Sequence, residues 1–199
     1  QASLKPIGLY SWTTSEPSDP AERSSVPPDQ NQLFQPTEKL VSWGRVVHAP
    51  HRLAKPGHPD ELAPLIESLT PEEPGLAIGL RRSYGDSNLN PNGAVIDMTG
   101  LDAMIAFDRD SGLMRAEAGV SLSQCLQVLV PSGWFLPTTP GSRFVTLGGA
   151  VANDVHGKNH HSAGTFGASV TRLGLRRSDS EPQTLERGNP LFHAPIGAL

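Results

Sequence analysis

The stretch "TLGGAVANDVHGKNHHSAGTFG", residues 146–167, joins a run of small residues to three closely spaced histidines. Gly148, Gly149 and Ala150 lie near the start of a helix that the pattern predicts over residues 146–157. Small side chains let another group approach the backbone closely, and a helix N-terminus here would favour a phosphate or the edge of a flat ring. Tight helix packing would require the same residue types. The first half of the stretch therefore predicts either a binding element or close packing.

Three of the seven histidines lie in the second half, namely His156, His160 and His161. His160 and His161 are adjacent and are expected to point apart on any regular element, whereas His156 and His160 are four apart and would share a helical face. The glycines at both sides argue against a helix. A zinc site usually needs three or four ligands, and only Asp154 is near. We therefore expect no metal, with His156 facing a bound cofactor and the other two as hydrogen-bonding core or rim residues.

A second segment rich in turn-forming residues, "GLRRSYGDSN" (79–88), follows a predicted strand. Gly79 and Gly85 permit backbone geometries that turn successive N–H groups toward an anion, and Arg81 and Arg82 supply positive charge. The segment matches neither a P-loop nor a Rossmann fingerprint. It predicts a cradle for a pyrophosphate, and the alternative is an irregular loop with two arginines in solvent.

Composition limits the class of protein. The 199 residues carry a net charge of −4, from 16 basic and 20 acidic residues, so we expect no nucleic-acid partner. The one cysteine, Cys125, cannot form an internal disulfide, which favours a reducing compartment. No apolar run approaches the roughly 18 residues that would span a bilayer. We expect a soluble protein in the cytoplasm or at a membrane surface, and a periplasmic location stays open.

Periodicity and turn signals predict an α+β fold. Residues 1–40, rich in Pro, Ser and acidic residues, are predicted to form an extended or disordered arm, with the folded domain over 41–199 beginning near Trp43. Helices are predicted over 58–69, 121–133 and 146–157, and strands over 75–80, 94–98, 104–108 and 113–120, the last two as a hairpin. Ser121 is predicted to cap its helix, whose buried face would be Leu122, Cys125, Leu126 and Leu129.

Five segments together carry a resemblance to a known family. They read "GLRRSYGDSNLN", "AVIDMTGLD", "AEAGVSLSQCL", "LPTTPGSRFVTLGGAVANDVHGKNHHSAGTFG" and "PLFHAPIGAL". They resemble the flavin-binding half of the decaprenylphosphoryl-β-D-ribose oxidase-like oxidoreductases, within the vanillyl-alcohol-oxidase or PCMH-type FAD superfamily. The resemblance runs from about Trp43 to Leu199, and "HGKNHHSAG" is its most specific part.

The resemblance implies a two-lobed FAD-binding domain whose cofactor lies along both glycine-rich segments. The residues implied to bind FAD are Ala77, Ile78, Gly79, Leu80, Arg81, Arg82, Ser83, Tyr84, Gly85, Asp86, Ser87, Gly141, Thr146, Leu147, Gly148, Gly149, Asn153, Asp154, Val155 and His156. His156 would lie near the flavin and Lys158 near the mouth of the substrate pocket, as candidate catalytic residues. Arg81 stands where the family usually has a glycine.

The resemblance also implies a noncovalent flavin. Superfamily members that attach FAD through the first loop use a histidine before a "S[FY]" pair, and Arg82 occupies that position here. The implied reaction is oxidation of a sugar carbinol to a ketone by hydride transfer to the flavin, most directly on a polyprenyl-phosphate-linked pentose. A reductase partner would complete a two-step epimerisation, and a lipid-linked substrate would bring the protein to a membrane surface.

The family's substrate domain and last flavin-domain strands have no counterpart before Leu199, so we expect a C-terminally incomplete domain. Three alternatives stay open. One is an FAD-dependent alditol or sugar-lactone oxidase, because specificity resides in the other half of such enzymes. Another is a histidine-dependent metal-binding module. The third is a nucleotide-binding or partner domain without turnover.

Overall fold

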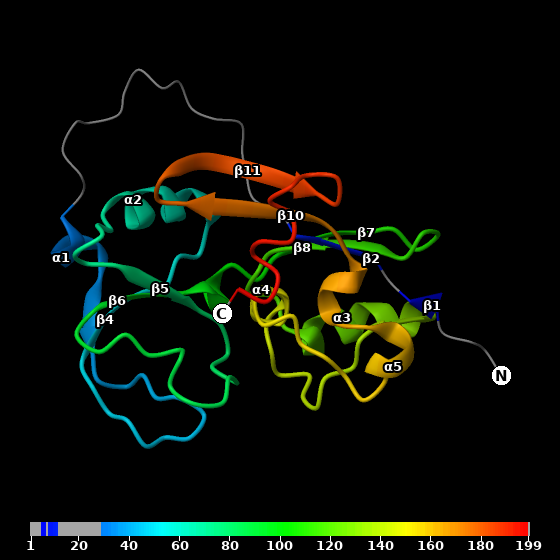
Figure 1. Ribbon diagram of the computed structural model, residues 1–199, viewed down its shortest axis with the longest axis horizontal. Helices are drawn as coiled ribbons and strands as arrows, with labels where there is room; N and C mark the ends of the chain where they lie inside the picture. Colours follow the sequence, from blue (N-terminus) through cyan, green and yellow to red (C-terminus); the bar gives the residue numbers. More distant parts are fainter. Residues whose placement is uncertain (1–4, 7, 12–28, 199) are drawn as a thin grey trace. The chain divides into compact units, whose positions relative to one another are not determined.

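The computed structural model describes residues 5–6, 8–11 and 29–198, which fall into two compact units (Figure 1). Unit 1 comprises residues 102–175 and 183–198, together with the two short N-terminal strands; unit 2 comprises residues 29–101 and 176–182. Both units mix helices with strands, which confirms the α+β prediction. None of the helices in the described part of the chain is long and apolar enough to cross a membrane.

Unit 2 is built on a four-stranded sheet in the order β3-β4-β6-β5. The strands are β3 (Gln35–Thr37), β4 (His51–Ala54), β5 (Gly75–Ile78) and β6 (Ala94–Asp97), accompanied by α1 (Gln30–Leu33), η2 (Pro59–Glu61), α2 (Leu62–Glu67) and η3 (Met98–Gly100). β4 and β5 both run parallel to β6, and β3 is antiparallel to β4. Ala94, Val95 and Ile96 are all buried, as expected for a central strand covered on both faces.

The alternation of side chains along β6 separates two hydrophobic clusters. Ala94 and Ile96 pack with helix residues such as Leu62 and Leu65. Val95 packs with Leu40, Ile78, Leu53, Leu76 and Leu89 in a smaller cluster. The second cluster lies where β5 ends, and therefore supports the loop that follows this strand.

Unit 1 is built on a five-stranded sheet in the order β11-β10-β2-β8-β7. The strands are β2 (Gly8–Ser11), β7 (Met104–Phe107), β8 (Leu113–Ala116), β10 (Val170–Arg177) and β11 (Ser180–Glu186), and β1 (Lys5–Pro6) pairs with β9 (Trp134–Phe135). The helices are α3 (Leu122–Leu129), η4 (Val130–Ser132), α4 (Leu147–Ala152), α5 (His160–Ala163) and η5 (Phe166–Ser169). β7 and β8 pair antiparallel, which confirms the predicted hairpin.

Helix α3 follows its sequence signals closely. The Ser121 Oγ accepts a hydrogen bond from the backbone N–H of Gln124 at 3.2 Å, and the Ser121 N–H donates to Gln124 Oε1 at 2.8 Å, which makes a capping box. Leu122, Cys125 and Leu129 are buried, as predicted, whereas Leu126 is half-buried. Burial raises the pKa of the Cys125 thiol to about 12, so this cysteine is an inert core residue.

Two predictions about the extent of elements are wrong. The extended arm was expected to reach residue 40, but residues 30–40 form α1 and β3 and bury Phe34 and Leu40 in the core of unit 2. Most of residues 1–28 lie outside the described part of the chain. The helix predicted over 146–157 ends at Ala152, because Asp154 adopts a left-handed backbone conformation with φ of 41°.

Candidate functional site

The first glycine-rich segment forms an irregular loop directly after β5 in unit 2. It brings the predicted residues Gly79 to Ser87 into one turn of the chain, while Ala77 and Ile78 belong to the strand before it. Arg81 and Gly85 have φ values of 54° and 75°. The special conformation predicted for Gly85 is therefore present, whereas Gly79 does not have a positive φ. At residue 81 an arginine adopts this conformation at a cost of about 1–2 kcal/mol.

The loop offers backbone donors. Among the residues that the structure describes, no backbone hydrogen bond is donated by Leu80, Arg81 or residues 83–85. A buried or ligand-facing N–H group needs an acceptor, and successive N–H groups around residues with positive φ form a concave anion site. This part of the chain therefore fits the pyrophosphate of a dinucleotide.

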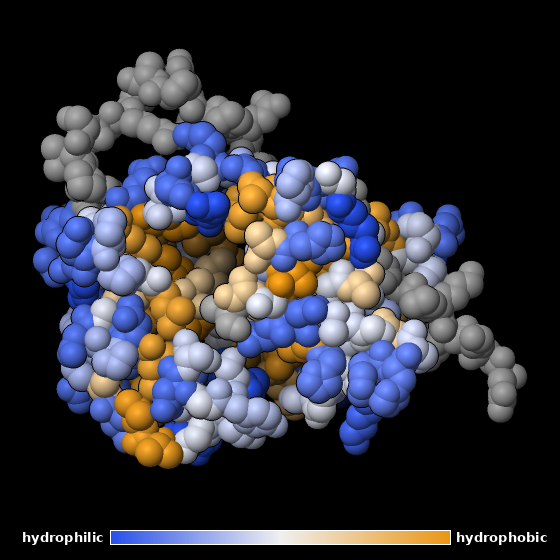
Figure 2. All heavy atoms as spheres, in the orientation of Figure 1, coloured by the Kyte–Doolittle hydropathy of each residue, from blue (hydrophilic) through white to orange (hydrophobic). Residues whose placement is uncertain are grey.

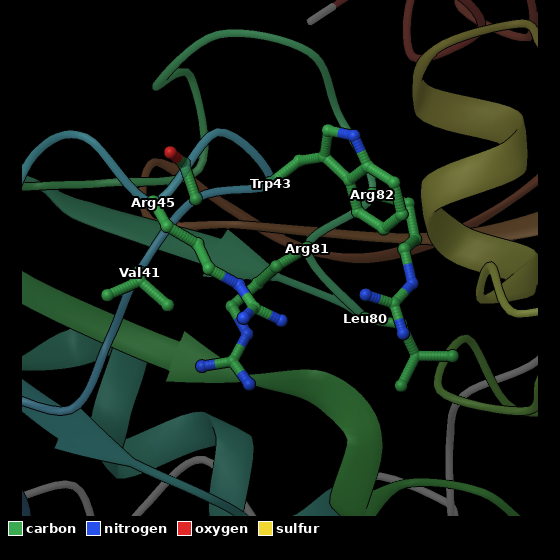
Figure 3. A pocket seen from close by; sticks show the side chains of 7 residues that line it. Val41, Trp43, Arg45, Leu80, Arg81 and Arg82 are labelled. Atoms are coloured by element: carbon green, nitrogen blue, oxygen red, sulfur yellow. The ribbon is translucent and has the colours of Figure 1, made fainter.

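Three arginines surround a hollow of about 160 Å³ at the start of this loop (Figure 3). The residues that line it are Val41, Ser42, Trp43, Arg45, Leu80, Arg81 and Arg82. The Arg82 guanidinium lies 5.2 Å from the ring centre of Trp43, a cation–π contact. The Ser42 hydroxyl donates to Asp86 Oδ1 at 2.6 Å, which fixes the floor of the hollow to the loop. The volume suits one phosphate group and its water, being below the roughly 300 Å³ of a typical small-molecule pocket.

The same segments expose large apolar side chains. Trp43, Val46 and Tyr84 are 53%, 80% and 87% exposed. Figure 2 shows hydrophobic and hydrophilic residues interspersed on the face that it draws. Exposed aromatic groups beside arginines would suit a ligand with both rings and phosphates.

The second glycine-rich segment in unit 1 behaves differently from the prediction. Its helix, α4, is capped by the side chain of Thr146, which accepts from the Gly149 N–H at 3.1 Å. The N–H groups of Leu147 and Gly148 donate to the carbonyls of Val120 and Ala118, both at 2.8 Å. Its three leading donors are therefore paired within the chain, which disfavours a phosphate at this helix N-terminus, and the cofactor contact expected for 146–149 stays a prediction.

Close packing explains the small residues of α4. A Cβ on Gly148 would lie 3.0 Å from the Cβ of Ala118, and Ala150 is fully buried. Gly141, by contrast, has no neighbour within 4 Å of a Cβ position. The segment therefore packs closely at Gly148 and Ala150, whereas Gly141 has open space around it.

Residues 153–156 form a fixed turn after α4. The Asn153 amide donates to the Gly149 carbonyl at 2.9 Å, and Asp154 Oδ1 accepts from the Gly167 N–H at 2.8 Å. The backbone of His156 pairs with that of Thr165 in an isolated β-bridge, and His156 is exposed. The turn thus presents His156 to the surface of unit 1 on a backbone held from two directions.

The histidines lie closer together than predicted. His160 and His161 start the short helix α5 and have ring centres 3.9 Å apart, so the expectation that they point apart is wrong. The glycines at both sides do not prevent this helix; Gly164 ends it with φ of 70°. His156 and His160 have ring centres 5.8 Å apart, although no helix connects them. Within the described residues, no group of three His, Cys, Asp or Glu side chains has an arrangement that could hold a metal ion.

Two residues of the histidine motif were missed as positioning residues. Asn159 donates to the Pro137 carbonyl at 2.7 Å and accepts from the backbone N–H and hydroxyl of Thr139 at 3.3 and 3.2 Å. A Cβ on Gly157 would lie 2.6 Å from the Thr139 carbonyl oxygen. Both residues tie the motif to 137–139. Only the residue types gave a signal, since Gly and Asn are common where chains approach closely.

Comparison with known proteins agrees with this geometry. A family model described as "FAD binding domain" matches residues 50–185. Over 167 residues the chain is 38% identical to decaprenylphosphoryl-beta-D-ribose oxidase of Mycolicibacterium smegmatis, which covers 81% of this chain and 36% of that protein. A D-lactate dehydrogenase of Anaerostipes hadrus is 29% identical over 65 residues, or 33% of this chain and 14% of that protein. The chain thus spans about a third of the first relative's length.

The fold is shared with a solved structure. The structure of an alkyldihydroxyacetonephosphate synthase superposes with a TM-score of 0.64 at 20% identity, covering 77% of this chain and 29% of that one. The family model covers more than half of the chain. The chain therefore belongs to the FAD-binding domain family.

Proposed function

We propose that this chain is the FAD-binding part of an oxidoreductase that oxidises a sugar carbinol to a ketone, most directly on a polyprenyl-phosphate-linked pentose. The observation that carries the proposal is the 38% identity to decaprenylphosphoryl-beta-D-ribose oxidase over 81% of the chain. When bound, FAD supplies the hydride acceptor.

The cofactor is proposed to be held without a covalent bond. The backbone N–H groups of 79–87 would bind the diphosphate, and Gly141, 146–149 and 153–156 would contact the rest of the cofactor. Support comes from the unpaired donors after β5 and from the open space around Gly141. Retention then depends on hydrogen bonds and ring burial, which are lost on unfolding.

His156 and Lys158 are proposed to act at the reacting end. Both side chains are exposed on unit 1, while the backbone beside them is held by the bonds of Asp154 and Asn159. A neutral imidazole can accept a hydroxyl proton, whereas a lysine suits the orientation of a phosphorylated substrate. Both roles require an exposed side chain on a fixed backbone, as this turn provides.

The reaction is tested with the intact protein that contains this chain. Decaprenylphosphoryl ribose is supplied in detergent, and reduction of bound FAD is followed by loss of its visible absorbance. His156→Gln should slow reduction and change its pH profile, whereas the control His161→Gln should not. Reduction by a free alditol, a sugar lactone or D-lactate, without reduction by the lipid-linked sugar, would contradict the substrate assignment.

A sugar-lactone or alditol oxidase is the runner-up, because the flavin domain is common to these activities. The metal-binding alternative predicts stoichiometric zinc and unfolding on chelation. The proposed oxidase predicts neither effect, since FAD and not a metal would then contribute folding energy. A reductase partner would act on the ketone product and complete an epimerisation. A lipid-linked substrate would bring the protein to a membrane surface, which co-purification with membranes tests.

A further inference from the structure

We propose that Arg45 and Arg81 form a phosphate-binding subsite in unit 2, whose ligand is a doubly charged phosphate group held by their side chains. The donors of this subsite are guanidinium groups, whereas the diphosphate contacts proposed above for residues 79–87 use backbone N–H groups. It rests on the proposed function only for the source of the phosphate, which is the FAD diphosphate or a second, phosphorylated ligand.

The first observation is backbone conformation. Arg45 and Arg81 come from different segments, yet each has φ of 54°, a region that arginine rarely adopts. Strained conformations of this kind persist where the surrounding structure imposes them, and they gather at binding sites. Both strained positions carry an arginine that lines the same hollow.

The second observation is convergence. Both side chains line the hollow described above, and Figure 3 shows both guanidinium groups directed into it. Arg82 approaches from the other side and lies over Trp43. Like charges brought together repel, and a phosphate between them would convert that repulsion into charge-assisted hydrogen bonds.

The third observation concerns counter-charges. Within the described residues, neither Arg45 nor Arg81 forms an ion pair with a carboxylate. Asp86 is bonded to the lining through the Ser42 hydroxyl, from which it accepts a hydrogen bond. The planar fork of a guanidinium matches two phosphate oxygens at once, so two such groups suit a dianion better than a monovalent halide.

The test measures thermal unfolding of FAD-free and FAD-loaded protein in inorganic phosphate, with chloride at equal ionic strength as the reference. A ligand that binds only the folded state raises the unfolding midpoint in proportion to its affinity. We expect phosphate to raise the midpoint, and Arg45→Gln or Arg81→Gly to weaken phosphate binding about tenfold or more, as loss of a charge-assisted contact requires. Arg109→Gln, in the exposed turn between β7 and β8, removes a charge elsewhere and should bind phosphate normally.

Arg81→Gly separates binding from folding. Glycine adopts positive φ without strain, so this variant should be as stable as the parent protein in chloride, or more stable, while it loses the phosphate effect. Arg81→Lys, which keeps the charge but not the fork, should recover only part of the affinity.

The two sources of phosphate give different results. If FAD abolishes the response to inorganic phosphate, the subsite holds the diphosphate of the cofactor; if FAD-loaded protein still responds, it holds a phosphate of a second ligand. Both results support the subsite. A phosphate response that is absent, or that Arg45→Gln and Arg81→Gly leave unchanged, overturns it. Failure to bind FAD would instead overturn the proposed function, and FAD-free protein would still report on the subsite.

Discussion

Gly157→Ala is expected to destabilise unit 1 and to weaken FAD binding. The added Cβ would lie 2.6 Å from the carbonyl oxygen of Thr139 and 2.7 Å from its carbonyl carbon and its nitrogen, where ordinary contact begins at 3.4 Å. All three are backbone atoms and cannot rotate away. Overpacking of this kind costs about 1–3 kcal/mol. Because Asn159 bonds to the same Thr139, relief of the clash would also displace the histidine motif.

Gly188→Ala is the matched control in the same unit. Nothing lies within 4 Å of its Cβ position, so its free energy of unfolding should change by less than about 0.5 kcal/mol. Urea unfolding followed by tryptophan fluorescence gives both values, with buried Trp134 as the reporter in unit 1. Equilibrium dialysis gives FAD affinity. Equal stability and equal FAD affinity in the two variants would refute the contact between Gly157 and Thr139.

Three other outcomes are expected. Ser121→Ala should lower the free energy of unfolding by about 1 kcal/mol through loss of the capping box, whereas Ser123→Ala, on the same helix, should have a smaller effect; equal losses would show that the cap does not matter. Burial raises the pKa of Cys125 from a usual 9.0 to about 12, so the stabilisation that comes from its buried neutral thiol is complete below pH 9 and declines as pH rises from 9 toward 12. The free energy of unfolding of Cys125→Ala should therefore change less with pH over this range, which urea midpoints at increasing pH would measure. Acid precipitation of the intact FAD-loaded protein should release the flavin into a yellow supernatant, because Arg82 replaces the usual attachment histidine; colour in the washed pellet would demonstrate a covalent bond.

Local signals predicted the elements that are stabilised locally. The capping box of α3 and the turn between β7 and β8 both lie within a few residues, and both appear as predicted. The end of α4 was missed because Asp154 bonds to the Gly167 N–H, thirteen residues away. A contact at that separation leaves no periodic trace in the sequence.

In the candidate site, too, the sequence indicated the local features and not those that depend on tertiary contacts. The glycine at 85 and the arginines at 81 and 82 predicted a special backbone conformation after β5, and Arg81 and Gly85 do have positive φ; the anion itself stays a prediction. At α4, composition did not indicate that Val120 and Ala118 accept the leading N–H groups, because this is a tertiary contact. Arg45 was missed altogether, since only folding brings it to the hollow that Arg81 lines.

The small cluster around Val95 holds both ends of the loop over residues 79–88. The residues of this loop can therefore be substituted without disturbing the sheet of unit 2. The loop leaves the core at Ile78 and returns to it at Leu89, and both side chains pack in that one cluster. Its two ends are therefore anchored in the same cluster, while half of the ten residues between them are exposed. Substitutions between the anchors can alter ligand contacts with little effect on the sheet. In descent from a common ancestor, such a loop could exchange a glycine for an arginine at residue 81 and acquire a new anion contact while the scaffold stayed the same.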